Sequence, residues 1–547
     1  MAQPMKKQNF LHGAALLAMA TAVVKLIGAL YKLPLKMAIG DQGYSYFTTA
    51  YDIYAVLLLV STAGLPVAMS RMISAASSLG KYGQVRRIYK TSLGIFLVLG
   101  ALGSGLMIFG CRWLANVLNQ PDAWAAILCL GPCALLMSIV STYRGFFQGQ
   151  SNMQPTSVSQ VLEAVFKLVI GLAAAYTVLH FTDSIPLAAA GAILGVTVGC
   201  VASAIYLRCK QAPAYRDLPH TSEFVPSYGT TAKKLLSIAV PVTIGAAGLQ
   251  FLMLAESGLY MGQLIDLFSQ RVYLPFFLEE GLSAQAAADS VKGIYNLTQT
   301  IFNMPCAFMT PIATSVLPAI TAHLTLGNHK MVRSTEESAA RVTSLVAVPC
   351  AVGLSVLARP IMALLGGYTG QRLELATQLL CILGVVVFMN AVVMYTNVVL
   401  QSHGKAHVPV IHMLLFGTLK LAAVYVLVGN PAIGILGAPF GAILSYVCIG
   451  GMNLISIHRF VPEKPRLLLN LLKPILPAVV MGLAVFGSYR GLIALLGEGG
   501  SRLLLCCIPI GVGVVVYVVA VVLFKTITAD DCKLLPKGEK IAKLLRL

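Results

Sequence analysis

The sequence predicts an all-α polytopic membrane protein, with about 14 transmembrane helices and both termini in the cytoplasm. Of the 547 residues, 57% are hydrophobic and 11% are charged, whereas soluble domains carry about 25% charge. Long apolar runs recur along the chain, and a run of about 20 residues can cross a hydrocarbon core about 30 Å thick. Lysine and arginine concentrate in alternate loops, as they do on the cytoplasmic side of membrane proteins. Together these features exclude a water-soluble fold.

The predicted spans follow one another along the whole chain. In the first half they cover residues 12–39, 46–72, 91–111, 123–144, 156–180, 186–208 and 236–262. In the second half they cover residues 292–318, 338–360, 374–400, 408–429, 433–457, 468–494 and 503–525. The first segment begins like a cleavable signal peptide, but it stays apolar as far as Ile39, which favours a retained helix.

The charges of the loops predict the orientation. Loops after the even-numbered spans and the C-terminal tail are basic: Lys81, Arg86, Arg87, Lys90, Arg208, Lys210, Arg216, Lys233, Lys234, Lys330, Arg333, Arg459, Lys464, Arg466, Lys533, Lys537, Lys540, Lys543 and Arg546. The opposite loops are poor in basic residues, and acids mark two of them: Asp183, Asp266, Glu279, Glu280 and Asp289. The positive-inside rule therefore places both chain ends in the cytoplasm.

Composition and motifs also exclude several functions. The net charge of +19 is spread over short loops and the tail, where anionic lipid head groups explain it, and nucleic acid is not an expected partner. The 12 cysteines are scattered, without the spacing of a disulfide framework or a metal site. No phosphate loop, zinc motif or nucleophile with a base occurs. We therefore expect no enzymatic activity, no metal and no cofactor, apart from a coupling H⁺ or Na⁺.

An internal repeat relates the two halves of the chain. Short motifs recur in the same order: Pro66 to Ser70 with Pro311 to Ser315, Gly80 with Gly327, Val85 with Val332, Gln148 with Gln401, and Lys167 with Lys420. The separation of Gln148 from Lys167 is identical to that of Gln401 from Lys420. Each repeat begins from the same side of the membrane, so the repeats are parallel and related by an axis along the membrane normal. Transporters built this way bind their substrate between the halves, near mid-membrane.

The repeat also predicts the domains. Two six-helix lobes, residues 1–210 and 236–458, are joined by a cytoplasmic linker at 211–235. Residues 459–547 add two C-terminal helices outside the duplication and the basic cytoplasmic tail.

Three lysines lie within the first predicted helix. Lys25, Lys32 and Lys36 are spaced by seven and four residues, which places them within about 40° of one another on one helix face. A lysine at the centre of a membrane helix costs about 2.5–3.5 kcal/mol, and only Lys36 lies near enough to the helix end to reach the interface easily. We interpret these lysines as a basic wall that receives an anion, although a structural pairing with an acid remains the alternative.

Other polar residues inside the spans are candidate partners. Asp52 and Glu256 have no counter-charge on their own helices, so each is a candidate counter-charge to Lys25 or a site for a coupling cation. Glu163 and Lys167 stand four residues apart, which favours a structural ion pair.

The eighth span carries a stripe of amides. Asn296, Gln299 and Asn303 share one face of the helix. They are expected either to line the cavity or to hydrogen-bond a neighbouring helix.

The motifs resemble a known group of transporters. Arg144-Gly-Phe-Phe-Gln-Gly-Gln-Ser-Asn-Met-Gln-Pro155 is similar to the polysaccharide-exporter signature between the fourth and fifth helices. Gly28 to Leu35 and Gly64 to Ser70 resemble the start of the stage V sporulation protein B group. That group lies in the multidrug/oligosaccharidyl-lipid/polysaccharide exporter superfamily, beside the lipid II flippases. The resemblance covers nearly the whole chain.

The resemblance implies a fourteen-helix fold, alternating access and a cationic central cavity in the bacterial cytoplasmic membrane. The implied substrate is a lipid-linked sugar pyrophosphate, such as a peptidoglycan precursor used in cell-wall synthesis or sporulation. Lys25 and Lys32 occupy places comparable to the basic residues that contact the pyrophosphate in the flippases, with lysine in place of arginine. Glu256 stands where relatives often have aspartate, and Asp52 where they often have proline. We expect a monomer, with the lipid-linked oligosaccharide and the bilayer as partners.

Two other functions fit parts of the pattern. A cation-coupled multidrug exporter on the same fold would use Asp52, Glu256 and the nearby tyrosines, but the lysines of the first helix argue against it. A scaffold for envelope or spore-coat assembly would not need charges inside several membrane helices. A flippase for an anionic, lipid-linked sugar is therefore the leading hypothesis.

Overall fold

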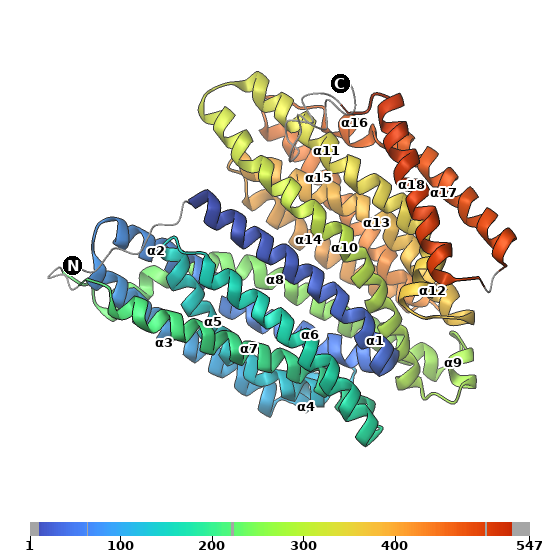
Figure 1. Cartoon of the computed structure of the whole chain (residues 1–547), viewed down its shortest axis with the longest axis horizontal. Helices are drawn as coiled ribbons and strands as arrows, with labels where there is room; N and C mark the ends of the chain where they lie inside the picture. Colours follow the sequence, from blue (N-terminus) through green and yellow to red (C-terminus); the bar gives the residue numbers. More distant parts are fainter. Residues whose placement is uncertain (1–9, 63, 220–223, 498–499, 528–547) are drawn as a thin grey trace. The chain divides into compact units, whose positions relative to one another are not determined.

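The computed structural model describes residues 10–62, 64–219, 224–497 and 500–527, and every regular element within them is helical (Figure 1). The helices of the first half are α1 (Phe10–Thr62), α2 (Leu65–Ser78), α3 (Tyr82–Phe109), α4 (Cys111–Val117), η1 (Pro121–Ala123), α5 (Trp124–Gly149), α6 (Gln154–Thr182), α7 (Ile185–Arg216) and α8 (Tyr228–Ser269). Those of the second half are α9 (Phe276–Glu279), α10 (Ala284–Thr325), α11 (His329–Val356), α12 (Ala358–Leu365), α13 (Gly370–Ser402), α14 (His407–Val428), η2 (Gly434–Leu436), α15 (Gly437–Phe460), α16 (Leu467–Leu472), α17 (Ile475–Leu496) and α18 (Arg502–Leu523). The basic tail at 528–547 lies outside the described residues.

The polytopic helical fold is confirmed. Within the described residues, ten helical segments are long and apolar enough to cross a membrane. The other predicted spans coincide with the long helices α1, α8 and α10. The number of fourteen and the orientation of the termini stay predictions.

The second predicted span differs from the structure at both ends. Instead of a loop between the first two spans, α1 continues through a kink at Gly40, whose φ of 70° and ψ of −175° are not helical. Glycine adopts a positive φ without the steric cost that a Cβ atom imposes. The span is also interrupted near Gly64, and α2 begins anew with Pro66 in its first turn. Proline favours a helix start because it lacks an N–H group. At position 311, by contrast, α10 continues without a break.

The chain divides into two compact units. The first comprises Met1–Asp266 with Leu282–Gly293, and the second comprises Leu267–Gly281 with Ile294–Leu547. This division follows packing, whereas the predicted lobes followed the repeat, so α8 and the start of α10 join the first unit. The boundary at 211–235 stays a prediction.

Glycines allow close helix packing in the first unit. α6 and α7 lie so near each other that a Cβ atom at Gly195 would overlap the backbone of Gly171. Gly191 and Gly199 would make similar overlaps with the backbone of α6. Small residues at helix interfaces are the usual way for membrane helices to approach.

The second unit has its own apolar core. α11, α13 and α16 meet there around Val332, Ala340, Tyr395 and Leu471, all of which are buried. The hydroxyl of Tyr395 donates a hydrogen bond to the backbone oxygen of Glu336, which ties α13 to α11. α17 packs on α11 and on α18, so the two C-terminal helices join this unit through α11 and α12.

The internal repeat is visible in the backbone of two turns. Gly80 and Gly327 have φ values of 70° and 68°, and each follows a helix. In both turns the next N–H group bonds to a carbonyl five residues back, from Lys81 to Ala76 at 2.9 Å and from Asn328 to His323 at 3.0 Å. This is a left-handed C-terminal cap, which glycine favours.

The second pair of turns shows the same pattern. Ser151 and Gly404 have φ values of 60° and 74°. The following residues, Asn152 and Lys405, bond to carbonyls five residues back at 3.0 and 2.9 Å. In these two pairs of turns, repeat-related positions therefore have similar backbone geometry in both halves.

Candidate functional site

The predicted charged residues of the first unit gather around Asp52. Asp52 lies half-buried on α1 and interacts electrostatically with Lys292, Lys32 and Glu256. Lys32 is also half-buried, and Glu256 on α8 is buried. The structure thus brings Asp52, Glu256 and Lys32 into one cluster. The side chain of Lys25 lies outside the described residues.

Lys292 was not predicted, although it is the central cation of this cluster. Its side chain is fully buried at the start of α10. The ammonium donates hydrogen bonds to Thr49 Oγ1 at 2.7 Å and to Gln120 Oε1 at 2.9 Å. It also lies 5.9 Å from the centre of the Tyr260 ring. Its hydrogen-bond acceptors are thus neutral oxygens, while its charged neighbours are Asp52 and Asp289.

Asp289 lies one helical turn before Lys292 and is fully buried too. It accepts hydrogen bonds from Gln120 Nε2 at 2.6 Å and from the Tyr46 hydroxyl at 3.1 Å. Gln285 Nε2 approaches both carboxylate oxygens at 3.4 Å. Gln120 therefore bridges the two charges, since its oxygen accepts from Lys292 and its nitrogen donates to Asp289.

Lys36 pairs with a nearby acid, Asp41, which was not among the predicted site residues. Its ammonium lies 3.3 Å from a carboxylate oxygen of Asp41, and both side chains are buried. Asp41 follows the kink at Gly40, so the pair joins the two parts of α1. The geometry therefore favours a structural role for Lys36 over membership of a basic wall.

Glu163 and Lys167 interact electrostatically, as predicted, but each makes its hydrogen bonds to other side chains. Glu163 accepts from Arg144 Nη2 at 3.2 Å, while Arg144 Nε donates to Ser159 Oγ at 3.0 Å. Arg144 thus ties α5 to α6 with the fork of its guanidinium.

Lys167 instead points to aromatic side chains of α1. Its ammonium donates to the Tyr51 hydroxyl at 3.0 Å. It lies 4.3 Å from the centre of the Tyr51 ring, 5.2 Å from that of Tyr31 and 5.9 Å from that of Phe47. Aromatic faces attract cations, so these rings hold the charge without neutralising it.

The amide stripe of α10 extends further than predicted. Asn296 is buried, Gln299 is half-buried and Asn303 is exposed. Lys292 lies four residues before Asn296, so it continues the same face by one turn. Extending the stripe by one turn towards the N-terminus would have found Lys292 from the sequence. Gln120 and Thr49 carry no comparable signal, because only tertiary folding brings them to Lys292.

The cluster contains both signs of charge. The charged side chains linked electrostatically in the described interior of the first unit are Lys32, Lys167, Lys292, Asp52, Glu163, Glu256 and Asp289. Within the described residues, no group of three or more His, Cys, Asp or Glu side chains is placed to hold a metal ion. Such a site can exchange ionic partners, which suits the temporary binding of a charged molecule better than a covalent reaction.

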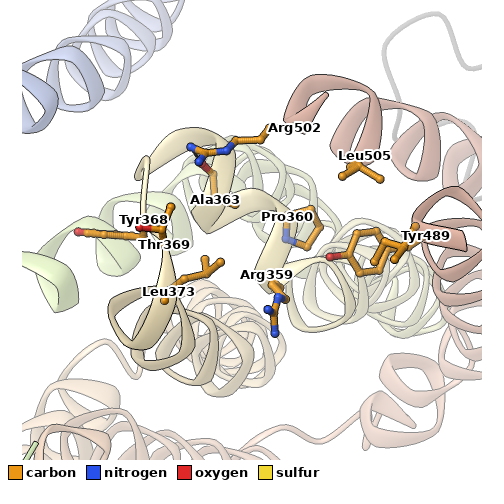
Figure 2. A pocket seen from close by; sticks show the side chains of 11 residues that line it. Arg359, Pro360, Ala363, Tyr368, Thr369, Leu373, Tyr489, Arg502 and Leu505 are labelled. Carbon is orange, nitrogen blue, oxygen red and sulfur yellow. Dashed lines mark hydrogen bonds between the residues drawn. The ribbon is translucent and has the colours of Figure 1, made fainter. Parts of the chain in front are cut away.

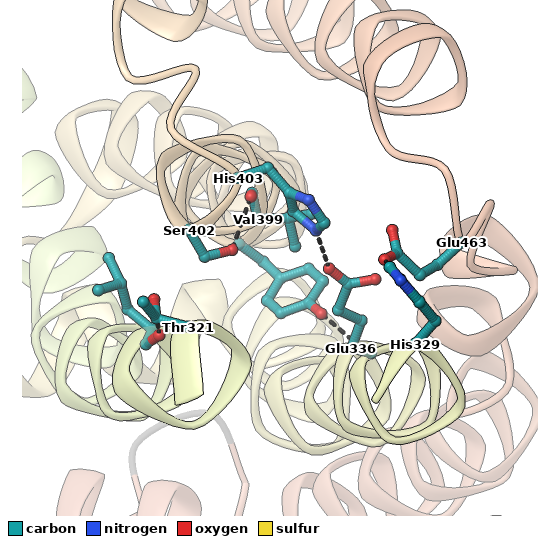
Figure 3. A network of polar contacts seen from close by, with 9 residues as sticks. Thr321, His329, Glu336, Val399, Ser402, His403 and Glu463 are labelled. Atoms are coloured by element: carbon teal, nitrogen blue, oxygen red, sulfur yellow. Dashed lines mark hydrogen bonds and ion pairs between the residues drawn. The ribbon is translucent and has the colours of Figure 1, made fainter. Parts of the chain in front are cut away.

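A polar network of the second unit is built mainly from histidine and glutamate (Figure 3). Glu336 is fully buried on α11, and its carboxylate lies 2.8 Å from His403 Nε2. Nearby, His329 Nδ1 lies 2.6 Å from Glu463, whose side chain is only 1% exposed. These contacts fasten the turn after α13 and the segment after α15 to α11, which is a structural role.

Comparison with known families extends over most of the chain. A family model described as polysaccharide biosynthesis protein matches residues 10–323, and one described as lipid II flippase MurJ matches residues 263–491. Two Bacillus subtilis proteins are similar over most of their length. Stage V sporulation protein B is 25% identical over 84% of this chain and 85% of its own. Lipid II flippase MurJ is 24% identical over 87% of this chain and 88% of its own.

Solved structures share the fold. The lipid II flippase MurJ in an inward closed conformation matches with a TM-score of 0.65 and 13% identity, over 93% of this chain and 98% of its own. An inward-facing multidrug resistance MATE family transporter of the MOP superfamily matches with a TM-score of 0.59 and 16% identity, over 81% and 99%. At these identities the likeness concerns the fold alone.

Proposed function

Because the chain belongs to the polysaccharide biosynthesis protein family, we propose that it translocates an anionic, lipid-linked sugar pyrophosphate across the membrane. It is a multi-pass protein of the cytoplasmic membrane. The proposed activity is transport and not catalysis, and the proposed acting form is a monomer. The relatives named above include a lipid II flippase, which supports a precursor of peptidoglycan or of a related polysaccharide as the cargo.

One observation carries the proposal, namely that Lys32 and Lys292 both interact electrostatically with Asp52 inside the first unit. A pyrophosphate that enters the cluster can take over both ammonium groups from the carboxylate. Asp52 attracts both lysines electrostatically and competes with the cargo for them. Such competition keeps the binding weak enough for release, which a transporter needs in each cycle.

The hydrogen bonds of Lys292 also favour the binding of a phosphate. Thr49 and Gln120 are uncharged acceptors, so replacing one of them by a phosphate oxygen gains a charge-assisted hydrogen bond. Lys25 would add a third cation from the same face of α1 as Lys32. Alternating access would then expose the cluster to one side of the membrane and afterwards to the other.

A translocation assay tests the proposal. The protein in vesicles that contain a fluorescent lipid-linked oligosaccharide pyrophosphate should move the label between leaflets. Lys32→Gln and Lys292→Gln should each lower the rate at least about tenfold, which corresponds to about 1.4 kcal/mol of lost interaction with the cargo. Lys420→Gln, at the repeat position of Lys167, is the matched control and should translocate normally. Unchanged rates in both Lys32→Gln and Lys292→Gln would contradict the anion site.

The acids of the cluster support a second candidate function. Asp52 interacts electrostatically with Glu256, and two neighbouring carboxylates are suited to hold a coupling H⁺ or Na⁺. A cation-coupled exporter of cationic drugs would depend on these acids and not on Lys32. Drug efflux that survives Lys32→Gln but is lost in Glu256→Gln would favour this function over the flippase.

A further inference from the structure

The second unit contains a cavity that the proposed transport does not use. Its volume is about 270 Å³, and it lies among α12, the start of α13, the end of α17 and the start of α18 (Figure 2). Side chains that can donate hydrogen bonds line it: Arg359, Tyr368, Thr369, Tyr489 and Arg502. Pro360 and Leu505 are buried against its wall. The lining therefore combines basic and hydroxyl-bearing side chains with an apolar wall.

The two arginines retain donors for a ligand. Arg502 Nη1 donates to the backbone oxygen of Ala363 at 3.2 Å. Arg359 Nη1 lies 3.5 Å from Glu374, and both side chains of this pair are about half exposed. Each guanidinium carries five N–H groups, and these contacts engage one nitrogen of each. The exposed pair with Glu374 is weak enough to yield to a stronger anion.

Two long helices begin at the same cavity. α13 starts at Gly370 after Thr369, and α18 starts at Arg502 after Ser501. Neither preceding side chain forms a capping hydrogen bond. Each helix start carries a partial positive charge and N–H groups that lack a partner within the helix. Helix starts and guanidinium groups together form an environment suited to phosphate.

The surroundings identify a lipid as the source of that phosphate. Large apolar side chains on α17 and α18 are exposed beside the cavity, among them Phe486 at 49%, Leu503 at 57% and Leu504 at 42%. Such faces contact acyl chains in a membrane protein. The predicted orientation places this end outside the cytoplasm, where basic residues are otherwise scarce. We propose that the cavity binds the phosphate of an anionic phospholipid of the outer leaflet, as a site separate from the transport cluster.

Lipid binding to the purified full-length protein tests this proposal. Native mass spectrometry would count phosphatidylglycerol and phosphatidylcholine retained from mixed micelles. The unaltered protein should prefer phosphatidylglycerol, and Arg359→Gln with Arg502→Gln should reduce that preference at least about tenfold. Arg490→Gln is the matched control, because Arg490 is an exposed arginine of α17 that lies over the Phe486 ring and does not line the cavity. It should leave the preference unchanged.

The remaining outcomes overturn either the anionic site or the lipid as its ligand. Equal binding of the two lipids by the unaltered protein, or full preference in the double variant, overturns the proposal. Displacement of phosphatidylglycerol by millimolar inorganic phosphate at equal affinity would overturn the lipid as source and leave a site for the free anion. If the glutamine variant does not fold, Arg359→Lys with Arg502→Lys keeps the charge and loses the fork of donors. That variant should show an intermediate preference, and an unchanged one contradicts recognition by the guanidinium groups.

Discussion

Two helix faces, one on α1 and one on α10, occupy repeat-related positions but carry different side chains. The correspondence is counted back from the matching prolines at positions 66 and 311. The face of α1 consists of Tyr44, Phe47, Tyr51 and Tyr54. The corresponding residues of α10 are, in the same order, Asp289, Lys292, Asn296 and Gln299. The face of α1 is aromatic, and its neighbouring rings lie 5.4–6.3 Å apart. The face of α10 is polar and charged.

Both faces hold a lysine, but they do so by different means. The aromatic face receives Lys167 from α6, at cation–π distance from Phe47 and Tyr51. The polar face supplies its own lysine, Lys292, which is held by Thr49 and Gln120. Corresponding sequence positions in the two halves thus carry different chemistry, with buried rings on α1 and buried charges on α10.

A second repeat-related pair shows the same divergence. Arg144 corresponds to Asn397, and Ser159 corresponds to His412. In the first unit Arg144 forms an ion pair with Glu163. In the second, Asn453 Oδ1 accepts a hydrogen bond from His412 Nδ1 at 2.8 Å, and Asn453 Nδ2 donates to Asn397 Oδ1 at 2.8 Å. At these repeat-related positions, neighbouring helices are therefore joined by an ion pair in the first unit and by amide and imidazole groups in the second.

The strongest test of the comparison replaces the buried lysine by the residue at its repeat position. Lys292→Phe should destabilise the protein by about 3–5 kcal/mol and abolish translocation, because buried carboxylates then lose their nearest cation. Equilibrium unfolding in mixed micelles measures the stability. Asp289→Asn in the same chain should recover part of the loss, and a double variant as unstable as the sum of both changes would contradict the coupling of the two charges.

The ion pair of Arg144 gives the next largest effect. Arg144→Asn, which introduces the residue of the second half, should cost about 1–3 kcal/mol because Glu163 is left without its partner at a site that is only partly exposed. A double-mutant cycle with Glu163→Gln measures the interaction itself. A coupling near zero would mean that the pair does not join α5 to α6 energetically.

Comparing the repeat-related Lys167 and Lys420 tests how much the aromatic face contributes to holding its lysine. Lys167→Met removes one hydrogen bond and three contacts with rings, so we expect a cost of about 1–3 kcal/mol. Lys420→Met should cost less, since the face that receives Lys167 has no aromatic counterpart at the repeat positions on α10. Unfolding midpoints of the two variants measure the difference, and equal costs would contradict the role of the rings.

Much of the fold could be predicted from the sequence because each membrane helix has a local signal. The apolar runs placed the helices, and the repeat motifs marked turns whose backbone geometry is alike, such as those at Gly80 and Gly327. The apolar run continues through the break near Gly64, so only Pro66 signals the new helix start there.

The candidate site was less predictable because charged partners are chosen by tertiary packing. Asp52 and Lys32 were singled out as charges inside apolar runs, and the structure places them in one cluster. The spacing of Glu163 and Lys167 favoured a local pair, yet Arg144 from a neighbouring helix and the rings of α1 offered each of them a better partner. Lys292 was overlooked because it lies at the boundary of its predicted span.

The smallest effect concerns a single hydroxyl on the aromatic face. Tyr51→Phe removes the acceptor of the Lys167 hydrogen bond and keeps the ring, so we expect a loss of about 0.5–1.5 kcal/mol. Tyr51→Leu also removes the ring and should cost more, because the ammonium then loses its nearest cation–π contact. The free energies of unfolding of the two variants separate the contribution of the hydrogen bond to Lys167 from that of the ring. If Tyr51→Phe were as costly as Tyr51→Leu, the hydroxyl alone would hold the lysine. The aromatic face would then bind its lysine through a hydrogen bond, as the polar face of α10 does, despite its different composition.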